Sequence, residues 1–149
     1  MTRTPYGMDE DSRRAVEADV TRLIHEYTWA NDAQDWDRCA ALYTEDASFR
    51  RPSGGDPVVG RAAILESFTA RKPRAQRHVI ANVLVDVEGP ATARARSVIV
   101  LYMGDATDDG SLPAQDPKSP LIGTFTDLCV LTPDGWRFKE RVGGLDFKP

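Results

Sequence analysis

The stretch Glu26-Tyr27-Thr28-Trp29-Ala30-Asn31-Asp32-Ala33-Gln34-Asp35-Trp36 ends one amphipathic segment and begins another. Its apolar stripe carries aromatic side chains and a carboxylate where a plain helix would carry aliphatic residues. A carboxylate among aromatics is costly to bury unless a hydrogen-bond donor pairs with it. His78, one of only two histidines, lies in the strand-like run Arg77-His78-Val79-Ile80-Ala81-Asn82-Val83. We therefore expect an Asp32–His78 pair, and the functional hypothesis depends on it.

Three helices are predicted in the first half of the chain. Apolar residues recur at helical spacing from Val16 to Ala30, which predicts one long helix with Asp11 or Ser12 as its N-cap. Asp35 can cap a second, shorter helix, whose apolar side would consist of Trp36, Cys39, Ala40 and Tyr43. The third helix is predicted over residues 61–69 and ends before the Lys72-Pro73 pair.

The remaining segments favour strands. A short strand is expected at residues 47–51, with 58–60 as its returning partner. Four long strands follow, at residues 76–87, 91–103, 121–131 and 136–147. Helices first and long antiparallel strands afterwards predict an α+β fold, with the helices packed into the concave face of a strongly bent sheet.

Length and composition limit the classes of protein to be considered. With 149 residues the chain is expected to form one domain, over residues 12–149, after a flexible leader at 1–11. The net charge of −4 has no basic stripe, which argues against nucleic acid as a partner. The sequence offers no membrane span and no signal peptide, so a cytoplasmic location is expected. No Gly-rich phosphate loop, HExxH motif or ligand cluster is present, so neither cofactor nor metal is indicated.

Five sequence pieces resemble the SnoaL-like proteins of the nuclear-transport-factor-2-like superfamily. They are Tyr27 through Asp32, Ala41-Leu42-Tyr43-Thr44-Glu45-Asp46-Ala47-Ser48-Phe49, Val59-Gly60-Arg61-Ala62-Ala63-Ile64, Arg77-His78 followed by Asn82, and Asp134-Gly135-Trp136-Arg137-Phe138 with Arg141. The resemblance implies a cone-shaped half-barrel around a mainly apolar pocket. The branch that includes scytalone dehydratase and hexachlorocyclohexane dehydrochlorinase uses a helix aspartate and a strand histidine to abstract a proton. Asp32 and His78 stand at those two positions, and Asn82 follows at the expected spacing.

Each candidate also has a structural interpretation. His78 would otherwise be a half-buried histidine bonded to a backbone carbonyl, and Asp32 would otherwise face water. Strand alternation predicts that His78, Ile80, Asn82 and Leu84 share one sheet face. Tyr27 is the first candidate for a hydroxyl donor to the substrate, although a core tyrosine with a satisfied hydroxyl is equally compatible with the sequence.

The further candidates for substrate binding are mostly aromatic. They are Trp36, Tyr43, Phe49, Phe68, Asn82, Tyr102, Phe125 and Arg141. For Arg141 a cross-strand ion pair with Asp127 is favoured over an anion clamp. Sequence alone leaves open whether the aromatic residues line a pocket or fill the core.

The leading hypothesis is a cofactor-independent lyase or isomerase that acts on a small apolar, oxygenated or halogenated molecule. Dehydration, cyclisation and dehydrohalogenation all remain open as reaction types. The alternatives are a non-catalytic binding or oxygenase-associated assembly subunit and, third, a hydrolase with a histidine-activated water. We also expect a homodimer, with a trimer as the second choice, because the outer sheet face would expose apolar residues.

Overall fold

The computed structural model describes residues 7–149. The helices are α1 (Glu10–Asp32), α2 (Trp36–Ala41) and α3 (Arg61–Thr69). The strands are β1 (Tyr43–Arg50), β2 (Val58–Val59), β3 (Ala75–Gly89), β4 (Thr92–Gly104), β5 (Leu121–Thr132) and β6 (Gly135–Leu145). None of the described helices is long and apolar enough to cross a membrane.

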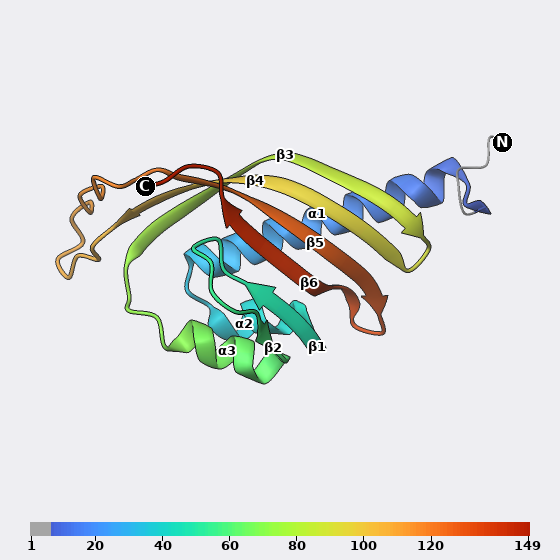
Figure 1. Ribbon diagram of the computed structural model, residues 1–149, viewed down its shortest axis with the longest axis horizontal. Helices are drawn as coiled ribbons and strands as arrows, with labels where there is room; N and C mark the ends of the chain where they lie inside the picture. Colours follow the sequence, from blue (N-terminus) through green and yellow to red (C-terminus); the bar gives the residue numbers. More distant parts are fainter. Residues whose placement is uncertain (1–6) are drawn as a thin grey trace.

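The six strands form one mixed sheet that is not closed, in the order β2-β1-β6-β5-β4-β3. Every neighbouring pair is antiparallel except β1 and β6, which run parallel. The long strands β3 to β6 arch over α1, while α2 and α3 lie with β1 and β2 at one end (Figure 1). The predicted α+β fold with a strongly bent, mostly antiparallel sheet is confirmed.

Helix α1 begins earlier than the sequence indicated. The side chain of Asp9, and not that of Asp11 or Ser12, is the N-cap, and it accepts a hydrogen bond from the Ser12 backbone N–H at 2.7 Å. Met8, inside the predicted leader, is buried in the core. Residues 1–6 lie outside the described residues, so the division into a leader and a domain stays a prediction.

The core is formed between α1 and the concave face of the sheet. Helix α1 contributes the predicted stripe, including Val16, Val20 and Leu23, all less than 9% exposed. Tyr43 does not belong to the second helix, as predicted, because α2 already ends at Ala41 and Tyr43 is the first residue of β1.

A β-bulge interrupts the alternation of side chains along β3. The pairing register with β4 shifts between Ala81 and Leu84, and Asn82 adopts a φ of +51°. His78 therefore faces inward whereas Asn82 and Leu84 are exposed, and the inward positions continue at Val83. The prediction that Asn82 and Leu84 share the face of His78 is wrong, because one extra residue in a strand reverses every later side chain.

Candidate active site

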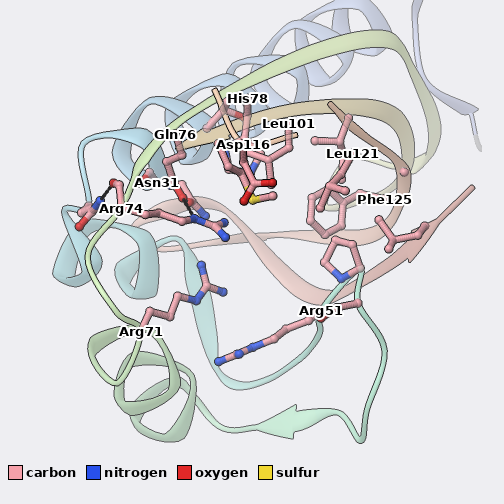
Figure 2. A pocket seen from close by; sticks show the side chains of 18 of the residues that line it. Asn31, Arg51, Arg71, Arg74, Gln76, His78, Leu101, Asp116, Leu121 and Phe125 are labelled. Atoms are coloured by element: carbon pink, nitrogen blue, oxygen red, sulfur yellow. Dashed lines mark hydrogen bonds between the residues drawn. The ribbon is translucent and has the colours of Figure 1, made fainter. Parts of the chain in front are cut away.

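A pocket of about 660 Å³ opens at the C-terminal end of α1. Its walls come from α1, the inner faces of the long strands, the connection between α3 and β3, and the loop between β4 and β5. One wall is apolar and consists of Ile80, Ile99, Leu101, Leu121 and Phe125. Figure 2 shows Asn31, Arg71 and Arg74 on the side away from Leu121 and Phe125. A pocket of this size fits a small organic molecule.

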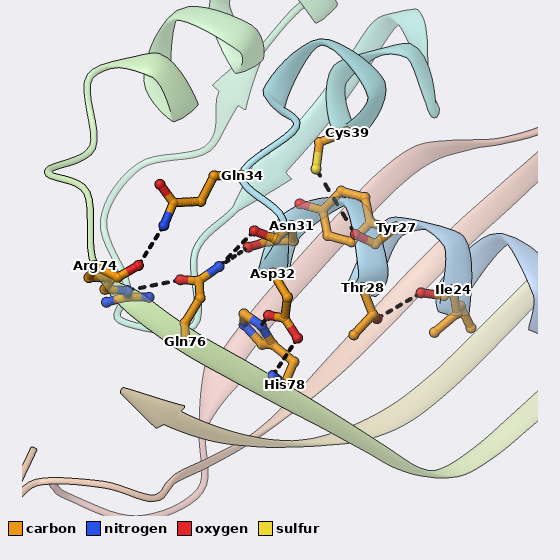
Figure 3. Close-up of polar contacts among 10 residues, drawn as sticks. All are labelled: Ile24, Tyr27, Thr28, Asn31, Asp32, Gln34, Cys39, Arg74, Gln76 and His78. Carbon is orange, nitrogen blue, oxygen red and sulfur yellow. Dashed lines mark hydrogen bonds and ion pairs between the residues drawn. The ribbon is translucent and has the colours of Figure 1, made fainter. Parts of the chain in front are cut away.

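Asp32 and His78 meet at the wall of this pocket. The Oδ1 atom of Asp32 lies 2.6 Å from Nδ1 of His78, and Oδ2 accepts the backbone N–H of His78 at 2.9 Å (Figure 3). Their side chains are only 6% and 14% exposed. His78 lines the pocket, whereas Asp32 is not among the lining residues. An ionised carboxylate only accepts hydrogen bonds, so in this contact Nδ1 carries the proton and Nε2 is left for a ligand.

A side-chain network holds the two elements that carry this pair. Gln76, two residues before His78, donates to both the backbone oxygen and Oδ1 of Asn31 at 2.8 Å each. Nε of Arg74 donates to Oε1 of Gln76 at 2.9 Å. Gln34 then donates to the backbone oxygen of Arg74 at 2.5 Å. The end of α1 is thus fixed against the start of β3 next to the Asp32–His78 contact.

Tyr27 reaches the pocket with its hydroxyl already in contact with a second tyrosine. The hydroxyl of Tyr43 donates to that of Tyr27 at 3.1 Å, and both side chains are buried. Burial raises the pKa of both phenols, so both stay protonated at neutral pH. Because the Tyr27 oxygen accepts in this contact, its own proton is left for another acceptor.

The predicted cross-strand ion pair is present. Arg141 and Asp127 are opposite each other on β6 and β5, with 3.1 Å between Nη1 and Oδ2, and both are about 1% exposed. The guanidinium of Arg141 also lies over three aromatic rings, those of Tyr27, Phe125 and Phe138. Burial raises the pKa of Asp127 to about 6, although the charge of Arg141 acts in the opposite direction. Arg141 nevertheless also lines the pocket.

Apart from Asp32, which reaches the pocket only through His78, the structure divides the predicted site residues into two groups. Six of them line the pocket, namely Tyr27, Trp36, Phe49, His78, Phe125 and Arg141. Whether these residues bind or convert a substrate stays a prediction.

Four predicted substrate-binding residues lie outside the pocket. Tyr43 and Phe68 are fully buried in an aromatic cluster, where their rings pack on each other and on Phe49. Tyr102 is 39% exposed because its neighbour Leu101 takes the inward position on β4. Asn82 is turned outward by the bulge.

The polar side of the pocket was not predicted from the sequence. Asn31, Arg51, Arg71, Arg74 and Gln76 all line it. The signal in the sequence is the pair of arginines, Arg71 and Arg74, that flanks Lys72-Pro73 directly before the strand of His78. Among residues 7–149, no three His, Cys, Asp or Glu side chains are grouped so that they could hold a metal ion.

An open, bent sheet around a long helix, with a pocket at the helix end, defines a small-molecule-binding domain of the nuclear-transport-factor-2-like class. The chain belongs to the SnoaL-like domain family, which matches residues 12–142. No curated protein matches the chain in sequence.

Solved structures share the fold. A "putative scytalone dehydratase" from Novosphingobium aromaticivorans has a TM-score of 0.79 at 20% identity, over 93% of this chain and 89% of that one. A nuclear-transport-factor-2-like protein with a cystatin-like fold from the same organism has a TM-score of 0.74 at 24% identity, over 96% and 94%. A "putative dehydratase" from Streptomyces avermitilis has a TM-score of 0.74 at 19% identity, over 88% and 97%. At these identities the likeness concerns the fold alone.

Proposed function

We propose that the protein is a cofactor-independent lyase or isomerase in which His78 removes a proton from a small, largely apolar molecule. The observation that carries this proposal is the double contact between Asp32 and His78 at the wall of an open pocket. A buried carboxylate that holds one ring nitrogen of a pocket-lining histidine is the arrangement that a general base requires.

The proposed step uses three residues in distinct roles. Nε2 of His78 takes a proton from a carbon of the substrate, and the electron pair of the broken C–H bond forms a double bond as a leaving group departs or an enolate forms. Asp32 keeps the imidazole in one orientation and balances the positive charge that it gains. Tyr27 supplies its proton, or a hydrogen bond, to the oxygen on which negative charge develops.

The surroundings support proton abstraction. Ile80, Leu101 and Phe125 give the pocket an apolar wall, and electrostatic interactions are stronger beside such a wall than in bulk water. The names of two structural neighbours, both "putative" dehydratases, agree with a reaction in which a proton and a leaving group are lost.

Proton abstraction can be tested without knowing the natural substrate. The probe is 5-nitrobenzisoxazole, a neutral aromatic molecule whose ring opens to a coloured phenolate once a base removes one carbon-bound proton. We expect the protein to accelerate this reaction and His78→Ala to lose about 100-fold of the acceleration, the lower range of general-base effects. His25→Ala, at the exposed second histidine, is the matched control and should keep the full rate.

The same experiment distinguishes the alternative function. A non-catalytic binding subunit would bind the probe, visible as quenching of tryptophan fluorescence, but would show no acceleration in any variant. Equal rates for the wild type and His78→Ala would refute the proposed role of His78.

A further inference from the structure

Three arginine side chains line one side of the pocket. Arg51 follows β1, Arg71 follows α3, and Arg74 precedes β3. Figure 2 shows their guanidinium groups directed toward a common space. Within residues 7–149, none of the three forms an ion pair with a carboxylate.

Of the three arginines, Arg71 has the fewest hydrogen-bond partners for its guanidinium N–H groups among the described residues. Its guanidinium lies over the rings of Phe68 and Trp36, 4.6 and 5.4 Å from their centroids, but in the described part of the chain its N–H groups donate no hydrogen bond. Burial lowers its pKa, and the neighbouring charges of Arg51 and Arg74 lower it further. A half-buried cation beside two like charges is unfavourable unless an anion joins them.

Among residues 7–149, the other two guanidinium groups also have N–H donors without a partner. Arg51 donates one N–H to the backbone oxygen of Ser67 at 2.9 Å, and in the same residues Arg74 donates only through Nε, to Gln76. The pocket does contain two carboxylates, Asp105 and Asp116, from the loop after β4. Oδ1 of Asp116 accepts the backbone N–H of Lys118 at 2.8 Å, so this carboxylate is engaged within its own loop.

We propose that the ligand of this pocket carries an oxyanion, a carboxylate or a phosphate, which Arg51, Arg71 and Arg74 hold while its apolar part packs on the aliphatic wall. Guanidinium groups suit this task because their paired N–H donors match the two oxygens of a carboxylate or phosphate. This proposal rests on the proposed function only for the reaction that follows binding, and not for the binding itself.

The geometry also places the anion relative to the proposed base. Arg74 is bonded to Gln76, and Gln76 and His78 face the pocket from the same strand, two residues apart. Arg74 thus connects the arginine cluster to the strand that carries His78, so an anion held by the arginines and a C–H bond at His78 would belong to different parts of one ligand. The substrate class is therefore a small acid with an apolar body, in which the C–H bond that faces His78 lies apart from the charged group.

The anion site can be tested with ligands that share the same aromatic body and differ in charge. We would titrate the wild type with 2-naphthoate, with its neutral methyl ester and with 2-naphthyl phosphate, using isothermal calorimetry. We expect at least one of the two anions to bind about tenfold or more tightly than the ester, as charge-assisted hydrogen bonds should provide. The stronger of the two anions identifies the group that the arginines prefer.

Single substitutions distinguish anion binding by the three arginines from non-specific electrostatic attraction of anions to the protein. Arg71→Met keeps an unbranched apolar stem over Phe68 and Trp36 and removes the charge, so it should abolish most of the preference for the anion. Arg74→Gln should also lower the preference for the anion. This second variant keeps the test valid if Arg71→Met does not fold. Arg50→Gln is the control, because Arg50 is exposed and outside the pocket while the change in net charge is the same.

Two results would overturn the proposal: equal affinities for both anions and the ester in the wild type, or an unchanged preference in folded Arg71→Met and Arg74→Gln. Repeating the titration with His78→Ala keeps this test separate from the proposed reaction. Retained anion preference in His78→Ala supports the anion site even if His78 turns out to have no role in catalysis.

Discussion

Oδ1 of Asp32 contacts Nδ1 of His78, and this contact leaves Nε2 as the ring nitrogen available to the pocket. In the neutral imidazole we expect the proton on Nδ1 and a free lone pair on Nε2. Nitrogen-15 NMR of the two histidines measures this directly, and exposed His25 serves as the internal reference. Asp32→Asn should shift His78 toward a mixture of tautomers, because a neutral amide no longer demands the Nδ1 proton. An Nε2-protonated His78 in the wild type would contradict the proposed geometry.

The buried pair of Asp127 and Arg141 gives a prediction for the dependence of stability on pH. The pKa of Asp127 is raised from 3.8 to about 6 in the folded protein, mainly by burial. Between these values the folded state binds more protons than the unfolded state, so the free energy of unfolding falls as pH rises.

Chemical denaturation of the wild type and of Asp127→Asn between pH 4 and 7 tests whether the free energy of unfolding falls as pH rises. The difference in unfolding free energy, wild type minus variant, should decrease from pH 4 to pH 6 by about 1–3 kcal/mol and then level off. A difference that increases over this range would show that the attraction of Arg141 outweighs the cost of burial.

The sequence predicted the Asp32–His78 contact because a carboxylate on a buried stripe needs a donor, and because the family resemblance supplied the strand. The Asp127–Arg141 pair was predictable from their positions on consecutive long strands. The role of Arg71 was not, since an arginine after a helix usually faces water. Only the three-dimensional course of the α3–β3 connection directs it inward.

At the scale of elements, the strands were predictable but their bulges were not. The third helix was predicted with its observed bounds, residues 61–69, because its apolar residues and the following proline mark both the face and the end. The bulge at Asn82 leaves no trace in the hydrophobic pattern, because apolar residues occupy both faces of β3 on either side of it. Asparagine adopts the left-handed backbone conformation at lower cost than most residues, and this explains why position 82 of the bulge is an asparagine.

Two adjacent glycines of β6 show where the bent sheet leaves no room. A Cβ atom on Gly143 would lie 2.7 Å from atoms of Pro52, whereas a Cβ on Gly144 would meet nothing within 4 Å. We expect Gly143→Ala to lower the free energy of unfolding by about 1–3 kcal/mol, as overpacking does, and Gly144→Ala to change it by less than about 0.5 kcal/mol. Thermal unfolding of both variants measures the contrast. Equal changes in unfolding free energy for the two variants would mean that the segment around Pro52 moves to make room for the added methyl group at no measurable cost in stability.

At the scale of the whole molecule, the outer face of the sheet carries an apolar patch. Val79, Val100 and Ile122 are paired across β3, β4 and β5, and Ala81 is paired with Val98 beside them. Val79 is 47% exposed in the isolated chain. We propose that a second copy of the chain covers this patch, because apolar surface of this kind is unfavourable in water.

Light scattering tests the oligomeric state. The wild type should show twice the chain mass of 16.5 kDa at micromolar concentration, and Val100→Lys should shift it to a monomer. Leu131→Lys, at an exposed leucine near the end of β5, is the control and should leave the dimer intact. A monomeric wild type would contradict the proposal, and a trimer would require a different pairing of the same face.

The class of fold was predictable because the order of helices and strands restricts the chain to few architectures. The parallel pairing of β1 with β6 is a tertiary feature that no local pattern encodes. The composition of the pocket is likewise not encoded in any local pattern, because its lining residues come from segments between Tyr27 and Leu145 that meet only in the folded chain.

Asp32 and His78 are proposed to act together as one general base. The most direct test is the rate of 5-nitrobenzisoxazole opening in the wild type, His78→Ala, Asp32→Asn and the double variant, each shown to be folded. Residues that act as a unit have strongly non-additive effects, so the double variant should be little slower than His78→Ala alone. If the two losses instead multiply, or if His78→Ala retains the rate of the wild type, the two residues do not form the proposed base.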